Sequence, residues 1–402
     1  AMIDSSQWLD MLQKGLTSDS AERRFDFDEL SQLWSSAYST GWTALIYVHC
    51  GNQLVVITAD AADPKPRLEP IPLDNTVRDL LERASLRHHR DDTYYNQAEA
   101  SKQQSERWDV LHRLGPILIP AHVQERLTPD RRLLIVPSAD LHALPWAALR
   151  IGEHWLAETA IIQLLPALGL WPQLAERRSD QPQALLMAVS DFAGRKGLLP
   201  NALKTLDIAE HSWAGGTERL DQEKATYQRL MQKAAADQLR QYGLIHIATH
   251  AELEQQGLLA NVSLVDEDLF YDDIVRLRLD GALVVLVVCE GAKGEALKGE
   301  EVLSLNRAFL VAGARDVIAS LWPLYNSTVL ELVEPLYEGL RSGTDAPTAV
   351  ARAQRALIAQ EKLSDGRSDL LASPRMWASL CAMGAGVVKW PPVGGTRPTD
   401  EG

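Results

Sequence analysis

The sequence has little cysteine, no long apolar run and no excess of positive charge. Only three cysteines occur, Cys50, Cys289 and Cys381, and no two of them form a CxxC pair. A disulfide framework or a cysteine-based zinc site is therefore not expected. No apolar run reaches about 18 residues, which excludes a membrane-spanning helix. The first residues are acidic and polar rather than a signal peptide, so we expect a cytoplasmic protein with reduced thiols.

The charge balance and several missing motifs narrow the possible functions. The formal net charge of the 402 residues is −14, which repels phosphate backbones and anionic membrane surfaces, so we expect neither nucleic acid nor a membrane as a direct partner. No glycine-rich loop ends in GK[ST], no GxGxxG follows a strand, and no GxSxG occurs. Nucleotide-binding loops and a serine-hydrolase elbow are thereby excluded.

Two buried apolar runs each end on a reactive side chain. The run GLIHIATH ends at His250, and the run ALVVLVVC ends at Cys289, directly before a glycine-rich loop. In an open parallel sheet, ligands bind beyond the carboxyl ends of the strands. We therefore expect the two side chains to meet at one sheet edge, as a cysteine nucleophile and its base.

Both residues also have a structural interpretation. A lone cysteine in an apolar strand is a buried core residue about as often as it is a reactive one. The glycines after Cys289, however, allow backbone N–H groups to approach a reacting carbonyl. His246 lies on the same strand face as His250, and HxxxH is a zinc spacing. That zinc motif needs a helix and a Glu after the first His, whereas Ile247 follows here. We expect His246 to position the site from inside the sheet.

The chain is predicted to form two lobes of strands and helices. We expect a helical segment at 1–40, a first lobe at 41–175, a second lobe at 183–388 and a disordered tail at 389–402. Within the first lobe, a hairpin should turn at Gly51 and Asn52. Residues 87–104 should be a mobile loop and residues 171–183 a linker. Strands and helices then alternate, which predicts a mostly parallel sheet covered on both faces. The expected strands are 131–139, 157–166, 184–190, 243–250, 282–289 and 316–322.

Five segments together resemble a known family. Their order and spacing are similar to those of a CHAT domain, a group of caspase-like cysteine peptidases of clan CD that are related to separase. The resemblance implies a caspase-like α/β/α sandwich with an N-terminal pseudo-peptidase lobe and a C-terminal catalytic lobe. It assigns the catalytic pair to His250 and Cys289. The segments are RRLLIVPSADLHALPWAAL (131–149), YGLIHIATHAE (242–252), LVVLVVCEGAKG (283–294), EEVLSLNRAFLVAGARDVIASLW (300–322) and SPRMWASLCAMG (373–384).

The chain departs from the family pattern in three places. Ala251 replaces the usual Gly after the histidine, and Gly291 replaces the usual Thr after Cys-Glu. An oxyanion hole uses backbone N–H groups, so Cys289 and Ala251 can still supply it. Relatives often carry an acidic pair after the strand that ends at Trp322, where this chain has Tyr325 and Asn326. With Glu290, these two are the expected substrate-binding residues. We predict a neutral residue before the cut, polar or moderately apolar, unless an acid such as Glu290, Glu252 or Asp191 enters the pocket.

These patterns predict a cysteine endopeptidase that acts on a protein substrate and needs no metal or organic cofactor. The family resemblance implies regulation by a sensor or repeat-domain partner, in bacterial defence or programmed death. Two alternatives remain open. One is a CHAT-like interaction scaffold without catalysis, and the other is a thiol enzyme that is not a peptidase, such as an acyltransferase or amidase.

Overall fold

A computed structural model describes the chain over residues 27–84, 97–138, 141–142, 144–177, 181–253, 260–290, 299–322, 324–325, 329–360 and 373–387. Within these ranges, the backbone alone is described at 97–107, 252–253, 260, 289–290, 299–304 and 325. The helices expected before residue 27 and the tail expected at 389–402 lie outside the described residues.

The first half of the chain begins with a helix and a three-stranded meander. The predicted hairpin is confirmed, and Gly51 adopts a φ of +60° in the two-residue turn between β1 and β2. The predicted mobile loop is wrong over 97–104, where α4 begins at Gln97, because Ala, Glu, Lys and Gln are good helix formers. The elements are α2 (Phe27–Ala37), β1 (Trp42–Cys50), β2 (Gln53–Asp60), β3 (Arg67–Pro72), α3 (Asn75–Ala84), α4 (Gln97–Leu118) and α5 (Ala121–Gln124).

Two more strands of the large sheet, β4 and β7, and several short elements complete this half. The strand expected at 157–166 begins later, because residues 156–159 form a helical turn. The linker expected at 171–183 begins instead with the helix α7. Trp171 and Leu174 bury that helix against the core, with Pro172 in its first turn. The elements are β4 (Arg132–Val136), the 3₁₀ helix η3 (Trp146–Ala148), β5 (Arg150–Ile151), β6 (His154–Trp155), α6 (Leu156–Thr159), β7 (Ile161–Leu164), η4 (Leu168–Leu170) and α7 (Trp171–Glu176).

The second half alternates strands and helices, as predicted. Its elements are β8 (Gln183–Ala188), α8 (Ala202–Ser212), β9 (Thr217–Asp221), η5 (Gln222–Lys224), α9 (Tyr227–Ala235), η6 (Gln238–Gln241), β10 (Tyr242–Thr249), β11 (Ala251–Leu253), β12 (Ala260–Ser263), β13 (Asp268–Phe270), α10 (Tyr271–Ile274), β14 (Leu283–Glu290), α11 (Gly299–Val311), β15 (Asp316–Ser320), β16 (Leu324–Tyr325), α12 (Val329–Arg341), α13 (Ala346–Gln360), α15 (Pro374–Trp377) and β17 (Leu380–Gly384).

One large sheet runs through both halves. Its strand order is β3-β2-β1-β4-β7-β17-β15-β14-β10-β8-β9, and β16 pairs with the end of β14. Neighbours from β1 to β17 and from β15 to β9 run parallel, whereas β17 and β15 run antiparallel. The expected mixed α/β fold with a mostly parallel sheet is thus confirmed. The sheet is continuous, and the division into lobes stays a prediction.

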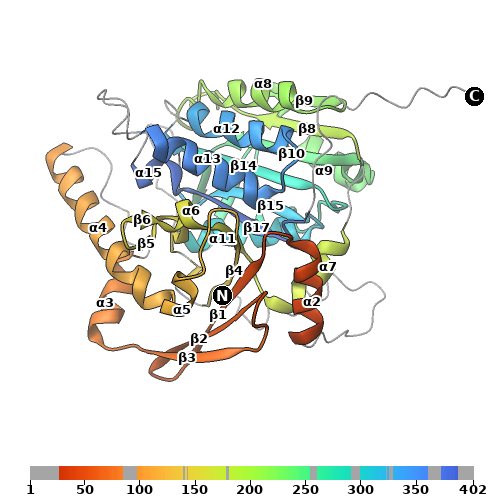
Figure 1. The fold of residues 1–402 in the computed structure, drawn as a ribbon. Coiled ribbons are helices and arrows are strands. Elements are labelled where there is room, and N and C mark those ends of the chain that lie inside the picture. Colours follow the sequence, from red (N-terminus) through yellow and green to blue (C-terminus); the bar gives the residue numbers. More distant parts are fainter. Residues whose placement is uncertain are drawn as a thin grey trace, which may run out of the picture.

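Helices cover both faces of the second half of the sheet. The connection from β8 through α8 to β9 and the connection from β14 through α11 to β15 run in opposite directions along the strand order. Because such crossovers are right-handed, the two helices lie on opposite faces of the sheet. α12 packs against both α8 and α13, and the three form one layer (Figure 1). The core is continuous across both halves. Among the described residues, no helix is both long and apolar enough to span a membrane.

Candidate functional site

The carboxyl ends of β10 and β14 lie side by side. The parallel register pairs Leu244 with Leu283 at one end and Thr249 with Val288 at the other. Continued by one residue, this register brings His250 next to Cys289 at the edge of the sheet. The backbone therefore brings the two predicted residues together, while the Cys289 side chain lies outside the described part of the structure.

A short strand lies on the other side of the end of β14. β16 runs parallel to it and pairs Cys289 with Leu324 and Glu290 with Tyr325. Two of the predicted substrate-binding residues, Glu290 and Tyr325, are therefore backbone neighbours at this edge. The third, Asn326, lies outside the described residues. The end of β14 thus has His250 on one side and β16 on the other.

The His250 side chain is held firmly at this edge. It is 4% exposed, and its ring lies 4.9 Å from the ring of Phe192, tilted by 42°. Its Nε2 lies 2.9 Å from the carbonyl oxygen of Gly197. A carbonyl oxygen only accepts hydrogen bonds, so Nε2 carries a proton. In the neutral ring, Nδ1 is then the nitrogen that can accept a proton.

His246 lies deeper in the same strand and has no exposed surface. Thr205 Oγ1 donates to the Ala202 carbonyl at 2.7 Å, so it accepts from His246 Nε2 at 3.0 Å. Nδ1 then accepts from the hydroxyl of Tyr337 at 2.7 Å. Burial lowers the pKa of His246 to about 3, and the ring is neutral. Both nitrogens are used in hydrogen bonds, which fits the expected structural role.

Ala251 begins a small antiparallel sheet next to His250. Its partner in β12 is Val262, and the N–H of Ser263 donates to the carbonyl oxygen of His250 at 2.9 Å. In a planar trans peptide, this carbonyl and the following N–H point in opposite directions. The N–H of Ala251 therefore points away from β12, a direction that suits a donor to an oxyanion.

The loop over residues 190–199 is the part of this site that the sequence did not predict. It is closed by a hydrogen bond from Leu199 N–H to the Ser190 carbonyl at 2.8 Å and carries Phe192 and Gly197. A positive φ at Ala193 (+52°) and Gly194 (+83°) makes the turn tight. The run AGRKG directly after a buried strand was the available signal. Asp191, considered as a substrate acid, caps this turn by accepting from Ala193 N–H at 2.9 Å.

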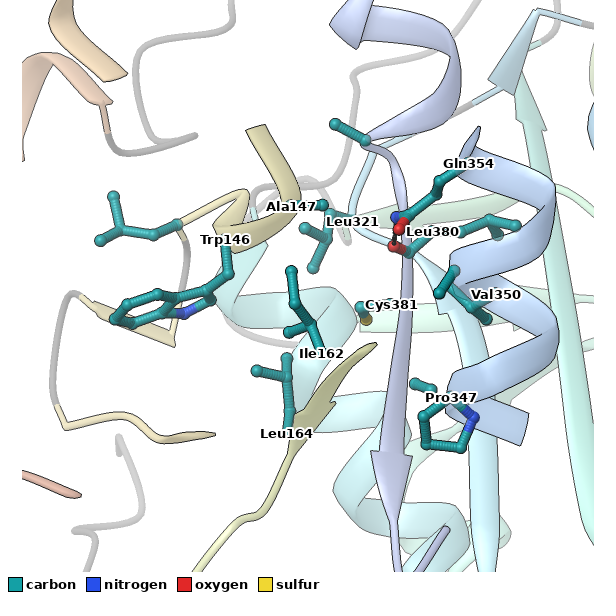
Figure 2. Close-up of a pocket in the computed structure, with 14 residues that line it drawn as sticks. Trp146, Ala147, Ile162, Leu164, Leu321, Pro347, Val350, Gln354, Leu380 and Cys381 are labelled. Carbon is teal, nitrogen blue, oxygen red and sulfur yellow. Dashed lines mark hydrogen bonds between the residues drawn. The ribbon is translucent and has the colours of Figure 1, made fainter. Parts of the chain in front are cut away.

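The other two cysteines lie elsewhere. Cys50 is exposed at the end of β1, in the first half of the sheet. Cys381 is 8% exposed in β17, and burial raises the pKa of its thiol to about 12. Such a thiol stays protonated and is a poor nucleophile. It lines a small apolar pocket between the two halves (Figure 2), with Trp146 and Ile162 from the first half and Val350 from the second.

The chain has a mixed α/β architecture built on one large, mostly parallel sheet. The family model described as "CHAT domain" matches residues 109–385, which is more than half of the chain. The chain therefore belongs to the CHAT domain family.

Two curated relatives match a short part of the chain. The tetratricopeptide repeat protein 28 of Mus musculus is 30% identical over 115 residues, which cover 29% of this chain and 4% of the relative. The Homo sapiens protein of the same name is 29% identical over 115 residues with the same coverage. The chain thus aligns with only a small fraction of the length of these relatives.

Solved structures of a Saccharomyces cerevisiae separase–securin complex are similar in fold. One has a TM-score of 0.56 at 11% identity and covers 89% of this chain and 31% of that chain. Another has a TM-score of 0.53 at 11% identity and covers 94% of this chain and 33% of that chain. At this identity the likeness concerns the fold alone.

Proposed function

We propose that this chain is a cysteine endopeptidase in which Cys289 is the nucleophile and His250 its base. The observation that carries the proposal is the register of β10 and β14, which makes these two residues neighbours at the carboxyl edge of the sheet. Membership of the CHAT domain family and the separase-like fold support it.

The described contacts of His250 suit this chemistry. Gly197 holds the proton of Nε2, and the same carbonyl accepts a stronger hydrogen bond once the ring is an imidazolium. Nδ1 takes the thiol proton, and the thiolate attacks the scissile carbonyl carbon. The oxyanion that forms is stabilised by the N–H groups of Cys289 and Ala251.

The tetrahedral intermediate then collapses. Its C–N bond breaks, and the proton on Nδ1 passes to the leaving amine. An acyl group remains on the sulfur of Cys289 as a thioester. A water molecule gives a proton to Nδ1, and its oxygen attacks the thioester carbon. The C–S bond then breaks, and the Nδ1 proton returns to the sulfur to restore the thiol. The acid product is released and ionises, giving its proton to solvent. No metal or organic cofactor takes part in these steps.

Substrate selection is proposed to occur beside β16. A buried cation without a carboxylate partner is costly, and the segment after Trp322 offers Tyr325 and Asn326 rather than acids. Glu290 is the backbone neighbour of Tyr325 and is the acid nearest in the register. We propose that the residue before the cut is neutral.

A protein partner is proposed to control the activity. The curated relatives are named for tetratricopeptide repeats, and the solved separase structures are complexes with securin. By analogy, a sensor or repeat-containing partner would switch this peptidase, in a bacterial defence or cell-death pathway.

A scaffold without catalysis is the second candidate, because Ala251 and Gly291 depart from the residues that usually flank the family's catalytic pair. A peptide chloromethyl ketone distinguishes the candidates, since it alkylates an activated thiolate. Cys50 is exposed and should be replaced by Ser in every variant, so that labelling reports on the site. Cys381→Ala is the matched control, because its buried thiol should not react.

We expect one label per chain, on Cys289, with or without a partner that raises the rate. Cys289→Ala should abolish labelling and peptide cleavage, and Cys381→Ala should keep both. Mass spectrometry of the labelled peptide locates the adduct. Absence of labelling at Cys289, even with candidate partners, would favour the scaffold. Labelling without cleavage of any member of a peptide library would favour an acyltransferase or amidase.

A further inference from the structure

We propose that Lys196 is a positioning residue for His250. It fastens the loop over residues 190–199, here called the His250 loop, to strand β12, and so keeps the Gly197 carbonyl against the imidazole ring. The proposal rests on the proposed thiol chemistry, which needs His250 in one tautomer.

The His250 loop is anchored at its base. Leu199 N–H donates to the carbonyl of Ser190 at 2.8 Å, and the side chain of Gln222 accepts from Ser190 N–H at 2.6 Å and from Asp191 N–H at 3.3 Å. These bonds hold the two ends of the loop. They leave the tip, which contains Lys196 and Gly197, to be fixed by other contacts.

Lys196 and Arg195 fix the tip to the end of β12. The Nζ of Lys196 lies 2.6 Å from Ser263 Oγ and 3.6 Å from Asp268 Oδ2, and its side chain is 9% exposed. Arg195 Nη2 donates to the carbonyls of Leu264 and Val265 at 2.6 and 2.8 Å. The Arg195 residue itself is exposed, whereas the Lys196 side chain is largely covered and Asp268 is half-buried.

The same serine holds the backbone of His250. Ser263 N–H donates to the His250 carbonyl at 2.9 Å, and Thr249 Oγ1 donates to the Ser263 carbonyl at 2.5 Å. The backbone N–H of Ser263 therefore bonds the main chain at His250, while its hydroxyl bonds Lys196. Gly197 follows Lys196 in the loop, and its carbonyl bonds the imidazole ring of His250. These contacts form a closed cycle that runs from His250 through Ser263, Lys196 and Gly197 back to the imidazole of His250.

This cycle of contacts explains how one tautomer of the His250 imidazole is selected. A fixed carbonyl at Nε2 keeps the hydrogen there and leaves Nδ1 to act as base. Without Lys196, the tip loses its bond to Ser263, while the exposed Arg195 still bonds the carbonyls of Leu264 and Val265. A displacement of about 1 Å at a catalytic group can reduce the rate about 10²-fold. Loss of Lys196 should therefore affect the chemistry without removing any group that reacts.

The test compares Lys196→Met with Lys204→Met. Lys204 is an exposed lysine on α8 and is the matched control. Because Lys196→Met leaves Asp268 without its cation, the double variant Lys196→Met/Asp268→Asn is the second arm, and Lys196→Arg tests rescue by charge. Each variant is labelled with ¹⁵N-histidine, and the ring nitrogen signals of His250 are assigned by their loss in His250→Gln. Alkylation of Cys289 by the peptide chloromethyl ketone is measured alongside.

In the parent protein and in Lys204→Met we expect a proton on Nε2 alone. In Lys196→Met and in the double variant we expect mixed tautomers and alkylation slower by about 10²-fold, with Lys196→Arg closer to the parent. A fixed Nε2–H tautomer and an unchanged alkylation rate in both Met variants would overturn the proposal and leave the proposed function standing. A parent protein whose Cys289 does not react would overturn the proposed function instead, and the tautomer measurement would still decide the role of Lys196.

Discussion

His246 lies within β10 and His250 directly follows that strand, and we predict opposite effects from replacing them with Ala. His246→Ala should mainly reduce stability, because the ring is fully buried and bonded at both nitrogens. His250→Ala should mainly reduce the rate, because the ring lies at the sheet edge beside the backbone of Cys289. The pair therefore separates a structural histidine from a catalytic one nearby in the chain.

The magnitude at His246 follows from its two partners. Each hydrogen bond is worth about 1 kcal/mol, and a buried hydroxyl left without its partner costs about 1–3 kcal/mol. Thr205 keeps its bond to Ala202, so the larger penalty falls on the buried hydroxyl of Tyr337. With the cavity left by the imidazole, we expect a loss of about 3–5 kcal/mol in unfolding free energy. His250 bonds the Gly197 carbonyl, and the loss of that hydrogen bond should cost about 1 kcal/mol.

The rate effects should run the other way. Removing a general base reduces the rate by about 10²–10⁴-fold, so His250→Ala should lose alkylation of Cys289 by that factor. His246→Ala should retain most of the rate below its melting temperature. The assay is the melting temperature and the alkylation rate for both variants. His122→Ala is the control, because His122 bonds Thr58 and Glu69 in the first half of the chain. Equal rate losses with unchanged melting temperatures would refute this assignment.

Three further predictions follow from the same structure. Asn326→Asp should shift a peptide-library profile towards Arg or Lys before the cut, and a parent profile already dominated by basic residues would contradict the argument. Burial lowers the pKa of His246 to about 3, so the unfolded chain binds its proton below pH about 6.5 while the folded chain does not. Stability should be unaffected by His246 above pH 6.5 and should fall by up to about 1.4 kcal/mol per pH unit towards pH 3; denaturant titrations should show a shallower decline for His246→Gln, and an equal slope would count against a buried neutral ring. A fragment over residues 181–402 should aggregate unless it is co-expressed with residues 1–180, because it exposes the edge of β17; a soluble fragment with cooperative melting would show that the second half folds alone.

The sequence predicted those elements whose signal is local. Short continuous apolar runs rich in β-branched residues located β10, β14 and β15, and a two-residue glycine turn located the β1–β2 hairpin. The proximity of His250 and Cys289 also followed from local information, because strand ends in a parallel sheet share an edge. Two predictions were wrong even though the nearby sequence indicated the correct structure. The helix formers from Gln97 onwards and the Trp-Pro start of α7 were present in the sequence and indicated helices.

What sequence reasoning missed depends on contacts between distant segments. The run AGRKG marks a turn in the His250 loop, but the role of the loop depends on the Gly197 carbonyl, which contacts a ring at the end of the neighbouring strand. β11, β12 and β13 are short, and β12 matters because Ser263 binds both the main chain of His250 and the ammonium of Lys196. Hydrogen bonds of this kind are set by tertiary packing, which no periodicity encodes.

The position of β17 extends this point to the whole fold. The strand comes last in the chain, yet it lies in the middle of the sheet, parallel to β7 through Met383 and Leu164 and antiparallel to β15. Its five residues are all buried, so their composition alone cannot reveal a partner or a direction. Because β17 joins the two halves, the first half supports β15, and β15 in turn aligns β14 and its terminal Cys289. The strand that carries the proposed nucleophile is therefore aligned by β15, which is itself paired with the C-terminal strand β17.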